Sequence, residues 1–255
     1  MKYDGIIFDW AGTTVDYGCF APVKAFIEAF EAFGITPTLE EVRKPMGMLK
    51  IDHVRTMLSM ERISQLWEEK YGRPWTEEDV NKIYKLSESK ILEIVAQFTD
   101  PKPYVLETVA ELRKMGLKIG STTGYTDEMM EIVVPAAAEK GYAPDYWVSP
   151  DAVDGCGRPY PYMIFKNMQE LKLQDVSRVM KVGDTVADIK EGKHAGMVSV
   201  GIVEGSSVMG LTAEEYEAMP EEVKETLYHQ VAGIYYAAGA DHVVRDIREI
   251  LYLMK

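Results

Sequence analysis

The sequence predicts an α/β protein with a doubly wound parallel sheet and an all-helical cap domain inserted after the first strand. Two observations lead to this fold class. Short apolar runs that end in turn residues alternate with helical patterns along most of the 255 residues, as in a parallel sheet covered on both faces. The stretch from about residue 22 to residue 98 breaks this rhythm, because it contains helical patterns and no convincing strand.

Six short apolar runs are the predicted strands of this Rossmann-like core. Turn residues flank these runs, which is typical of buried parallel strands. The first run, Gly5 to Trp10, contains Asp9 near its end and leads into a Gly12-Thr13-Thr14 turn. The other five runs are Leu117 to Thr122, Tyr146 to Ser149, Val179 to Asp184, Val198 to Val203 and His242 to Val244.

Two helices of the core are delimited by residues with known preferences at helix ends. Tyr104 to Met115 is followed by Gly116, a residue type that often follows the last helical turn. Thr126 is expected to cap a helix whose first turn carries two acidic residues. Pro135 lies within this second pattern, and we expect it to kink or shorten the helix.

The interrupting stretch carries several helix signals of its own. Apolar residues at helical spacing stop at Gly34, and Thr38 with Glu41 forms a capping box whose helix ends by Pro45. A third helix begins near residue 48, and Thr76 can cap a long one. We therefore expect residues 1–20 and 100–255 to form the α/β catalytic core and residues 21–99 the helical cap domain. The links should lie near residues 17–21 and 99–103.

Composition narrows the range of partners and compartments. A net charge of -13 argues against nucleic acid and anionic membranes as partners, because both attract clustered Lys and Arg. An anionic ligand would then need a cation and a few basic residues close to it. The only two cysteines, Cys19 and Cys156, form no C-x-x-C pair, which suits a reducing compartment. With no signal-peptide or membrane-spanning pattern, we expect a cytoplasmic protein.

Polar residues gather in four loops at the predicted carboxyl ends of strands, the edge where open parallel sheets bind ligands. Asp9 stands in the first loop, where a buried carboxylate needs a cation or donors, although it can also simply cap the turn. The second loop is Ser121 to Gly124, which offers small donors. The third holds Arg158 between Gly157 and Pro159; its guanidinium can bind two oxygens of an oxyanion or lie in solvent.

The fourth loop contains Asp184 and, one helical turn later, Asp188. Both carboxylates can face one point, and together with Asp9 they would repel one another unless a divalent cation lay among them. Oxygen ligands with retained water suit Mg²⁺. Asp188 alone is equally compatible with an acidic residue in the first turn of a helix.

These residues, in this order, resemble the haloacid dehalogenase superfamily, and the helical insertion matches the cap that many of its members carry. The resemblance implies that Asp9 attacks phosphorus and forms an aspartyl phosphate that water then cleaves. It implies that Asp9, Asp184 and the main-chain carbonyl of Ala11 bind Mg²⁺, with support from Asp188. The implied contacts to phosphate or substrate are Gly12, Thr123, Gly124 and Arg158.

Ala11 is a departure from the phosphatases of this superfamily, which place a second Asp two residues after the nucleophile. That Asp protonates the oxygen of an alcohol leaving group. The sequence therefore lacks the acid that ordinary ester hydrolysis requires, and Asp16 stands too far along the loop to replace it. Either the protein is a poor phosphatase, or its leaving group is activated in another way.

Lys50 offers such an activation. It stands at the expected start of the third helix of the insertion, at the border of an apolar stripe formed by Ile51, Val54 and Leu58. A half-buried lysine at a helix amino terminus is shifted towards its neutral form by desolvation and by the helix dipole. A neutral amine can attack a carbonyl and form a Schiff base. A lone lysine at this place can also extend into solvent.

Several segments together resemble the phosphonoacetaldehyde hydrolase family, also called phosphonatases: FDWAGTTVDYG, KPMGMLKIDH, GSTTGYT, GRPYP and KVGDTVAD. The resemblance covers nearly the whole chain and includes Ala11. It implies that Lys50 forms an imine with the aldehyde of a small phosphonate substrate, so that the leaving group becomes an enamine. It further implies a homodimer.

Four more residues are expected to line the space between cap and core: His53, Met46, Cys19 and Tyr125. His53 or water can shuttle protons. Met46 and Cys19 can equally serve packing alone.

The alternative function is a phosphatase or phosphomutase of the same superfamily acting on a small phosphorylated metabolite, which Ala11 disfavours. A non-catalytic binding protein would be expected to lack the nucleophile or the acidic pair, and a P-loop sequence is absent.

Overall fold

The six predicted strands form one parallel sheet in the computed structural model, which describes residues 2–254. Their order is β3-β2-β1-β4-β5-β6, and every neighbouring pair is parallel. The chain leaves β1 for β2 on one side and later adds β4 on the other, so the order reverses at β1. The strands are β1 (Gly5–Phe8), β2 (Lys118–Thr122), β3 (Tyr146–Val148), β4 (Val179–Gly183), β5 (Val198–Ile202) and β6 (His242–Val244).

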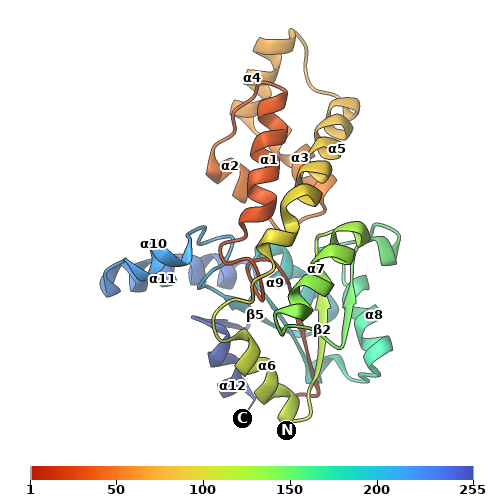
Figure 1. Cartoon of the computed structure of the whole chain (residues 1–255), viewed down its shortest axis with the longest axis vertical. Coiled ribbons are helices and arrows are strands. Elements are labelled where there is room, and N and C mark those ends of the chain that lie inside the picture. Colours follow the sequence, from red (N-terminus) through yellow and green to blue (C-terminus); the bar gives the residue numbers. More distant parts are fainter. Residues whose placement is uncertain (1, 255) are drawn as a thin grey trace.

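Helices cover both faces of the sheet, which confirms the predicted α/β class (Figure 1). Successive residues of β1 point to opposite faces: Ile6 and Phe8 pack with α6, α7 and α12, whereas Ile7 packs with α8 and the end of α9. These and the neighbouring elements are α6 (Val105–Lys114), α7 (Asp127–Glu139), α8 (Tyr162–Leu171), α9 (Val186–Ala195), α10 (Ala213–Glu217), α11 (Glu221–Ala237) and α12 (Ile250–Leu253), with short 3-10 turns η2 (Asp151–Val153), η3 (Val176–Arg178) and η4 (Ile247–Glu249).

The expectation that Pro135 would shorten its helix is wrong. Thr126 caps α7 as predicted, because its side chain accepts a hydrogen bond from the N–H of Met129. The helix then continues through Pro135 to Glu139. Its buried residues, among them Met130 and Val133, pack into the main core of the sheet. The packing of this face therefore outweighs the hydrogen bond that a proline removes.

Helices without any strand make up residues 20–98, here called the helical insertion, which lies above the carboxyl edge of the sheet (Figure 1). Thr38 and Thr76 both form the capping boxes expected from the sequence. Buried side chains such as Phe30, Val54 and Trp67 give the insertion a hydrophobic cluster of its own. Its elements are α1 (Phe20–Ala32), α2 (Leu39–Arg43), α3 (Lys50–Leu58), α4 (Glu61–Tyr71), α5 (Glu77–Ile94) and η1 (Val95–Phe98).

Two chain segments join the insertion to the sheet, and they run side by side. Val15 forms an antiparallel bridge with Pro101, and the N–H of Lys102 donates to the carbonyl of Thr14 over 2.9 Å. Asp16 caps α1, since its carboxylate accepts from the N–H groups of Phe20 and Ala21. The insertion is thus attached at one narrow point, the arrangement that permits rotation of one part against another.

Among residues 2–254, no helix combines the length and the apolar composition that are required to span a bilayer.

Candidate active site

A small cavity of about 30 Å³ lies between the helical insertion and the carboxyl ends of β1, β2 and β4. It brings together most of the site residues predicted from the sequence; Gly12, Asp188 and His53 lie outside its lining. The lining residues are Asp9, Ala11, Cys19, Pro22, Met46, Gly47, Lys50, Thr123, Gly124, Tyr125, Arg158, Asp184 and Thr185.

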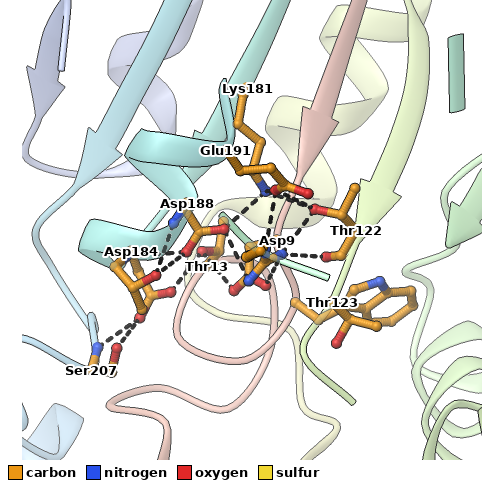
Figure 2. A network of polar contacts seen from close by, with 12 residues as sticks. Asp9, Thr13, Thr122, Thr123, Lys181, Asp184, Asp188, Glu191 and Ser207 are labelled. Carbon is orange, nitrogen blue, oxygen red and sulfur yellow. Dashed lines mark hydrogen bonds and ion pairs between the residues drawn. The ribbon is translucent and has the colours of Figure 1, made fainter. Parts of the chain in front are cut away.

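Asp9 follows β1 directly and is nearly buried. Its main-chain N–H continues the sheet ladder by donating to the carbonyl of Val182 over 2.9 Å. The Oδ1 atom accepts a hydrogen bond of 2.7 Å from Nη2 of Arg158, and Oδ2 lies 3.3 Å from the hydroxyl of Thr13 (Figure 2). The carboxylate is therefore held in one orientation, with a cavity in front of it, as a nucleophile requires.

Asp184 lies beside Asp9 at the end of β4. Its Oδ2 accepts two hydrogen bonds of 2.7 Å, from the N–H and the hydroxyl of Ser207, and Thr13 approaches Oδ1 at 3.2 Å. Burial raises the pKa of Asp184 to about 8, and the neighbouring carboxylates of Asp9 and Asp188 add to the shift. A cation beside Asp184 would reverse this effect, because it stabilises the ionised form.

Asp188 stands behind this pair, in the first turn of α9. Burial alone would raise its pKa, but Arg158 and Lys181 hold the pKa below the usual value. Its Oδ1 lies 3.0 Å from Nη1 of Arg158 and 2.9 Å from Nζ of Lys181, while Oδ2 accepts from the hydroxyl of Thr185 over 2.5 Å. Asp188 therefore connects the carboxylate pair to a buried ionic network.

Lys181 and Glu191 belong to this network and were missed by sequence reasoning. Both are fully buried; Lys181 contacts Asp188 and Glu191, and Glu191 accepts from Nε of Arg158 over 3.0 Å (Figure 2). A lysine inside an otherwise apolar strand was a usable signal, as was an acid one turn after Asp188. Neither pattern shows which distant residue neutralises the charge of Lys181 or of Glu191.

The charges of the site suit a divalent cation. Arg158 and Lys181 are the cations in ion-pair contact with the carboxylate cluster of Asp9, Asp188 and Glu191, and Asp184 adds a fourth carboxylate beside them. When all are ionised, two positive charges face four negative ones. Oxygen atoms of Asp9, Asp184 and Asp188 lie within 4.8 Å of one another, and all are hard ligands of the kind that Mg²⁺ prefers.

Gly12 is required for the approach of Asp184. Its φ is +88°, and a Cβ atom there would lie 2.1 Å from Oδ2 of Asp184. The N–H of Gly12 already donates to Val15 over 2.8 Å, and its carbonyl accepts from Nζ of Lys102 over 2.5 Å. Because Gly12 has no side chain, the Asp184 carboxylate can lie against it. Its N–H is already hydrogen-bonded to the carbonyl of Val15.

Lys50 is the first residue of α3 and faces the core across the cavity. Instead of being half-buried as expected, it is only 6% exposed, and burial lowers the pKa of its amine despite the opposing influence of Cys19 and Asp9. Its Nζ lies 5.1 Å from the ring centre of Tyr125, and a Cβ at Gly124 would stand 3.9 Å from it. A primary amine whose pKa is lowered by burial thus points towards the loop that follows β2.

The expectation that His53 lines the cavity is wrong. His53 is fully buried one turn behind Lys50, and its ring stacks on Phe26 with 3.9 Å between the centroids. Burial, and then the charge of Lys50, lower the pKa of this imidazole well below its usual value. Helical periodicity placed His53 near Lys50 but could not show which side of α3 Phe26 covers.

The remaining predicted residues, Met46, Cys19, Tyr125 and Thr123, do line the cavity. Met46 also belongs to the hydrophobic cluster of the insertion, and burial raises the pKa of the Cys19 thiol well above its usual value. The hydroxyl of Thr123 accepts from the N–H of Tyr125 over 3.0 Å. A protonated thiol at Cys19 is a poor nucleophile.

Comparison with known proteins shows the family to which the chain belongs. The family model for haloacid dehalogenase-like hydrolases matches residues 3–196. The phosphonoacetaldehyde hydrolase of Lysinibacillus sphaericus is 50% identical over 254 residues, covering 100% of this chain and 94% of that protein. A bifunctional phosphonoacetaldehyde hydrolase/aminoethylphosphonate transaminase of Clostridioides difficile is 51% identical over 249 residues, which is 98% of this chain and 39% of the longer relative.

Among solved structures, a phosphonoacetaldehyde hydrolase-like protein from Oleispira antarctica superposes with a TM-score of 0.95 at 36% identity, covering 100% of this chain and 92% of that one. A putative phosphoglycolate phosphatase from Lactobacillus delbrueckii, at 19% identity and a TM-score of 0.73, shares the fold. The chain therefore belongs to the haloacid dehalogenase-like hydrolases and, within them, to the phosphonoacetaldehyde hydrolase family.

Proposed function

We propose that this enzyme hydrolyses phosphonoacetaldehyde to acetaldehyde and phosphate by breaking the carbon–phosphorus bond. The observation that carries the proposal is the buried Lys50 amine facing the Asp9 carboxylate across one cavity, whose lining also includes Ala11. The names of the relatives support the substrate. An amine for the aldehyde and a carboxylate for the phosphoryl group are both needed for this reaction.

Lys50 is proposed to activate the carbon side. Its neutral amine adds to the aldehyde carbon, and loss of water leaves a protonated imine. Burial supports this role, because it lowers the pKa of the amine and so favours the unprotonated form, whose electron pair is free to attack. The hydroxyl that departs takes up one proton, which water supplies, because the His53 ring lies outside the cavity lining and its pKa is lowered well below the usual value.

Asp9 is proposed to take the phosphoryl group. Its carboxylate attacks phosphorus, the carbon–phosphorus bond breaks, and the electron pair of that bond moves into the imine to give an enamine. Because the imine accepts these electrons, no acid is needed to protonate an oxygen leaving group, which accounts for Ala11. Protonation of the enamine carbon and attack by water release acetaldehyde and Lys50, and a second water releases phosphate from Asp9.

Mg²⁺ is the proposed cation, held by Asp9, Asp184 and the carbonyl of Ala11, with Asp188 behind them. When bound, it neutralises charge on the phosphoryl oxygens. Arg158 and Thr123 are proposed to orient the phosphoryl oxygens, since both line the cavity and Arg158 already forks between Asp9 and the acids behind it. Gly124 leaves room for substrate beside Lys50.

We also propose that residues 21–99 form a mobile cap on a catalytic core of residues 1–20 and 100–255. A cavity of about 30 Å³ supports this, because a phosphonate needs the cap to open before it can enter. A homodimer is proposed as well, supported by the exposed aromatic side chains of Tyr160, Tyr162 and Phe165 near α8. Two free cysteines support a reducing, cytoplasmic location.

The fused relative from Clostridioides difficile suggests what supplies the substrate. Its name joins this hydrolase to an aminoethylphosphonate transaminase. Transamination of a primary amine yields an aldehyde, so the class of reaction that precedes this enzyme is the conversion of an aminophosphonate into its aldehyde.

Borohydride trapping tests the proposal. Incubation with phosphonoacetaldehyde and borohydride, followed by peptide mass mapping, should find a substrate-derived adduct on Lys50. Lys50→Arg should abolish both adduct and turnover, whereas Asp9→Ala should abolish phosphate release and still permit the adduct. Labelling of another lysine, or hydrolysis of an aryl phosphate at a rate rivalling the aldehyde substrate, would contradict it and favour a phosphatase.

A further inference from the structure

Arg43, at the end of α2, joins the helical insertion to the loop after β5 through hydrogen bonds. Its Nη1 donates to the carbonyl of Gly18 over 2.7 Å and to the carbonyl of Ser207 over 3.1 Å. Gly18 lies in the first connecting segment, and Ser207 lies in the core. The Arg43 guanidinium group therefore contacts both the segment that connects the insertion to the core and a loop of the core itself.

Phe20 and Gly210 lie against the side chain of Arg43. The guanidinium carbon lies 4.9 Å from the ring centre of Phe20, and Gly210 lies against the side chain. Gly210 has a φ of +69°, and a Cβ atom there would lie 2.8 Å from Nε of Arg43. The planar group is therefore held between an aromatic ring and bare backbone, an arrangement that a lysine cannot reproduce.

Ser207 connects Arg43 to the proposed metal site. Ser207 is fully buried; its carbonyl accepts from Arg43, while its N–H and hydroxyl both donate to Oδ2 of Asp184 over 2.7 Å. The same residue thus receives a hydrogen bond from the insertion and orients a proposed Mg²⁺ ligand (Figure 2). No other described residue donates to that carboxylate oxygen.

We propose that Arg43 is a positioning residue that couples closure of the cap to the orientation of Asp184. When the cap is closed, Arg43 fixes the Ser207 main chain, and Ser207 fixes the carboxylate. When the cap opens, the Arg43–Ser207 contact breaks and Asp184 is held less firmly. Because such coupling is reciprocal, Mg²⁺ binding should in turn favour the closed cap.

The inference rests on the proposed Mg²⁺ site and on cap movement, and it does not depend on the aldehyde substrate. It can therefore be tested by Mg²⁺ binding alone, even if phosphonoacetaldehyde proves not to be the substrate. Isothermal titration of folded Arg43→Ala with Mg²⁺ should show an affinity lowered by about tenfold, the effect of losing a charged hydrogen bond that supports a ligand. Arg43→Lys should be intermediate. Arg62→Ala, which removes an exposed cap arginine paired with Glu41, should bind Mg²⁺ as the wild type does.

A double-mutant cycle with Ser207→Ala identifies the route. Arg43→Ala and Ser207→Ala should lower Mg²⁺ affinity by amounts that do not add in the double variant, because both act on Asp184 through one loop. Mg²⁺ should also protect the connecting segments of the wild type from limited proteolysis, and Arg43→Ala should lose this protection. Unchanged Mg²⁺ affinity in a folded Arg43→Ala, or fully additive losses, would overturn the proposal.

Discussion

The guanidinium of Arg158 lies 2.7 Å from Oδ1 of Asp9 and contacts Asp188 and Glu191 on its other side. With 2% of its side chain exposed, it joins the proposed nucleophile to a network in which every charge depends on a partner. Buried pairs of this kind contribute little net stability when intact but are costly to break, because removal of one partner leaves an unpaired charge.

Arg158→Lys should therefore impair both stability and turnover. A lysine supplies one point charge in place of a fork, so residue 158 can no longer contact all three acids, and Asp9, which has no ion pair with Lys181, is the one left unpaired if the lysine turns to the other two, at a cost of about 3 kcal/mol. We expect a melting temperature several degrees lower and a kcat/KM reduced by at least about a hundredfold. Arg113→Lys, at an exposed pair with Asp145, is the matched control and should change neither quantity.

Gly12→Ala tests the close approach of the two loops. The new methyl group would collide with Oδ2 of Asp184 at 2.1 Å, and the positive φ adds strain. Mg²⁺ binding, followed by calorimetry, should be lost together with activity. Gly72→Ala shares a positive φ (+66°) but meets no atom within 4 Å, so it should lose a little stability and keep Mg²⁺ binding. Equal Mg²⁺ affinity in both variants would contradict the geometry.

Removal of Mg²⁺ should make stability depend on pH through Asp184. Its folded pKa is raised to about 8, so between about pH 4 and pH 8 the folded protein binds a proton that the unfolded chain has released. The unfolding free energy of the metal-free enzyme should therefore fall as pH rises through this window. Denaturant titrations in EDTA should show the fall, and saturating Mg²⁺ should remove it. A metal-free stability that rises from pH 5 to pH 8 would contradict the assignment.

Lys50→Met should stabilise the protein while abolishing turnover. Burial lowers the folded pKa of Lys50, so the unfolded chain holds this proton more tightly and the lysine destabilises the fold at neutral pH. Methionine has a similar length and no charge. The variant should melt at a higher temperature than the wild type at pH 7, and the difference should shrink as pH rises towards 10. A lower melting temperature at pH 7 would show that the ammonium is stabilised in the fold.

The order of the elements could be predicted from the sequence because the signals are local. Apolar runs marked all six strands, and Thr38, Thr76 and Thr126 marked helix starts through contacts within three residues. The family pattern identified Asp9, Asp184 and Lys50 as site residues. The expected shortening of the helix at Pro135 was wrong, because the sequence shows the lost hydrogen bond and not the core packing that retains the helix.

Local residue patterns determined which acids and amines this protein has at the ends of its strands and at the start of α3. Only the tertiary structure decided how they are paired: Lys181 with Asp188 and Glu191, Arg43 with Ser207, and His53 against Phe26. The physical reason is that charge and burial depend on neighbours far along the chain. The pKa of Lys50 departs from its ordinary value only because the fold buries the amine.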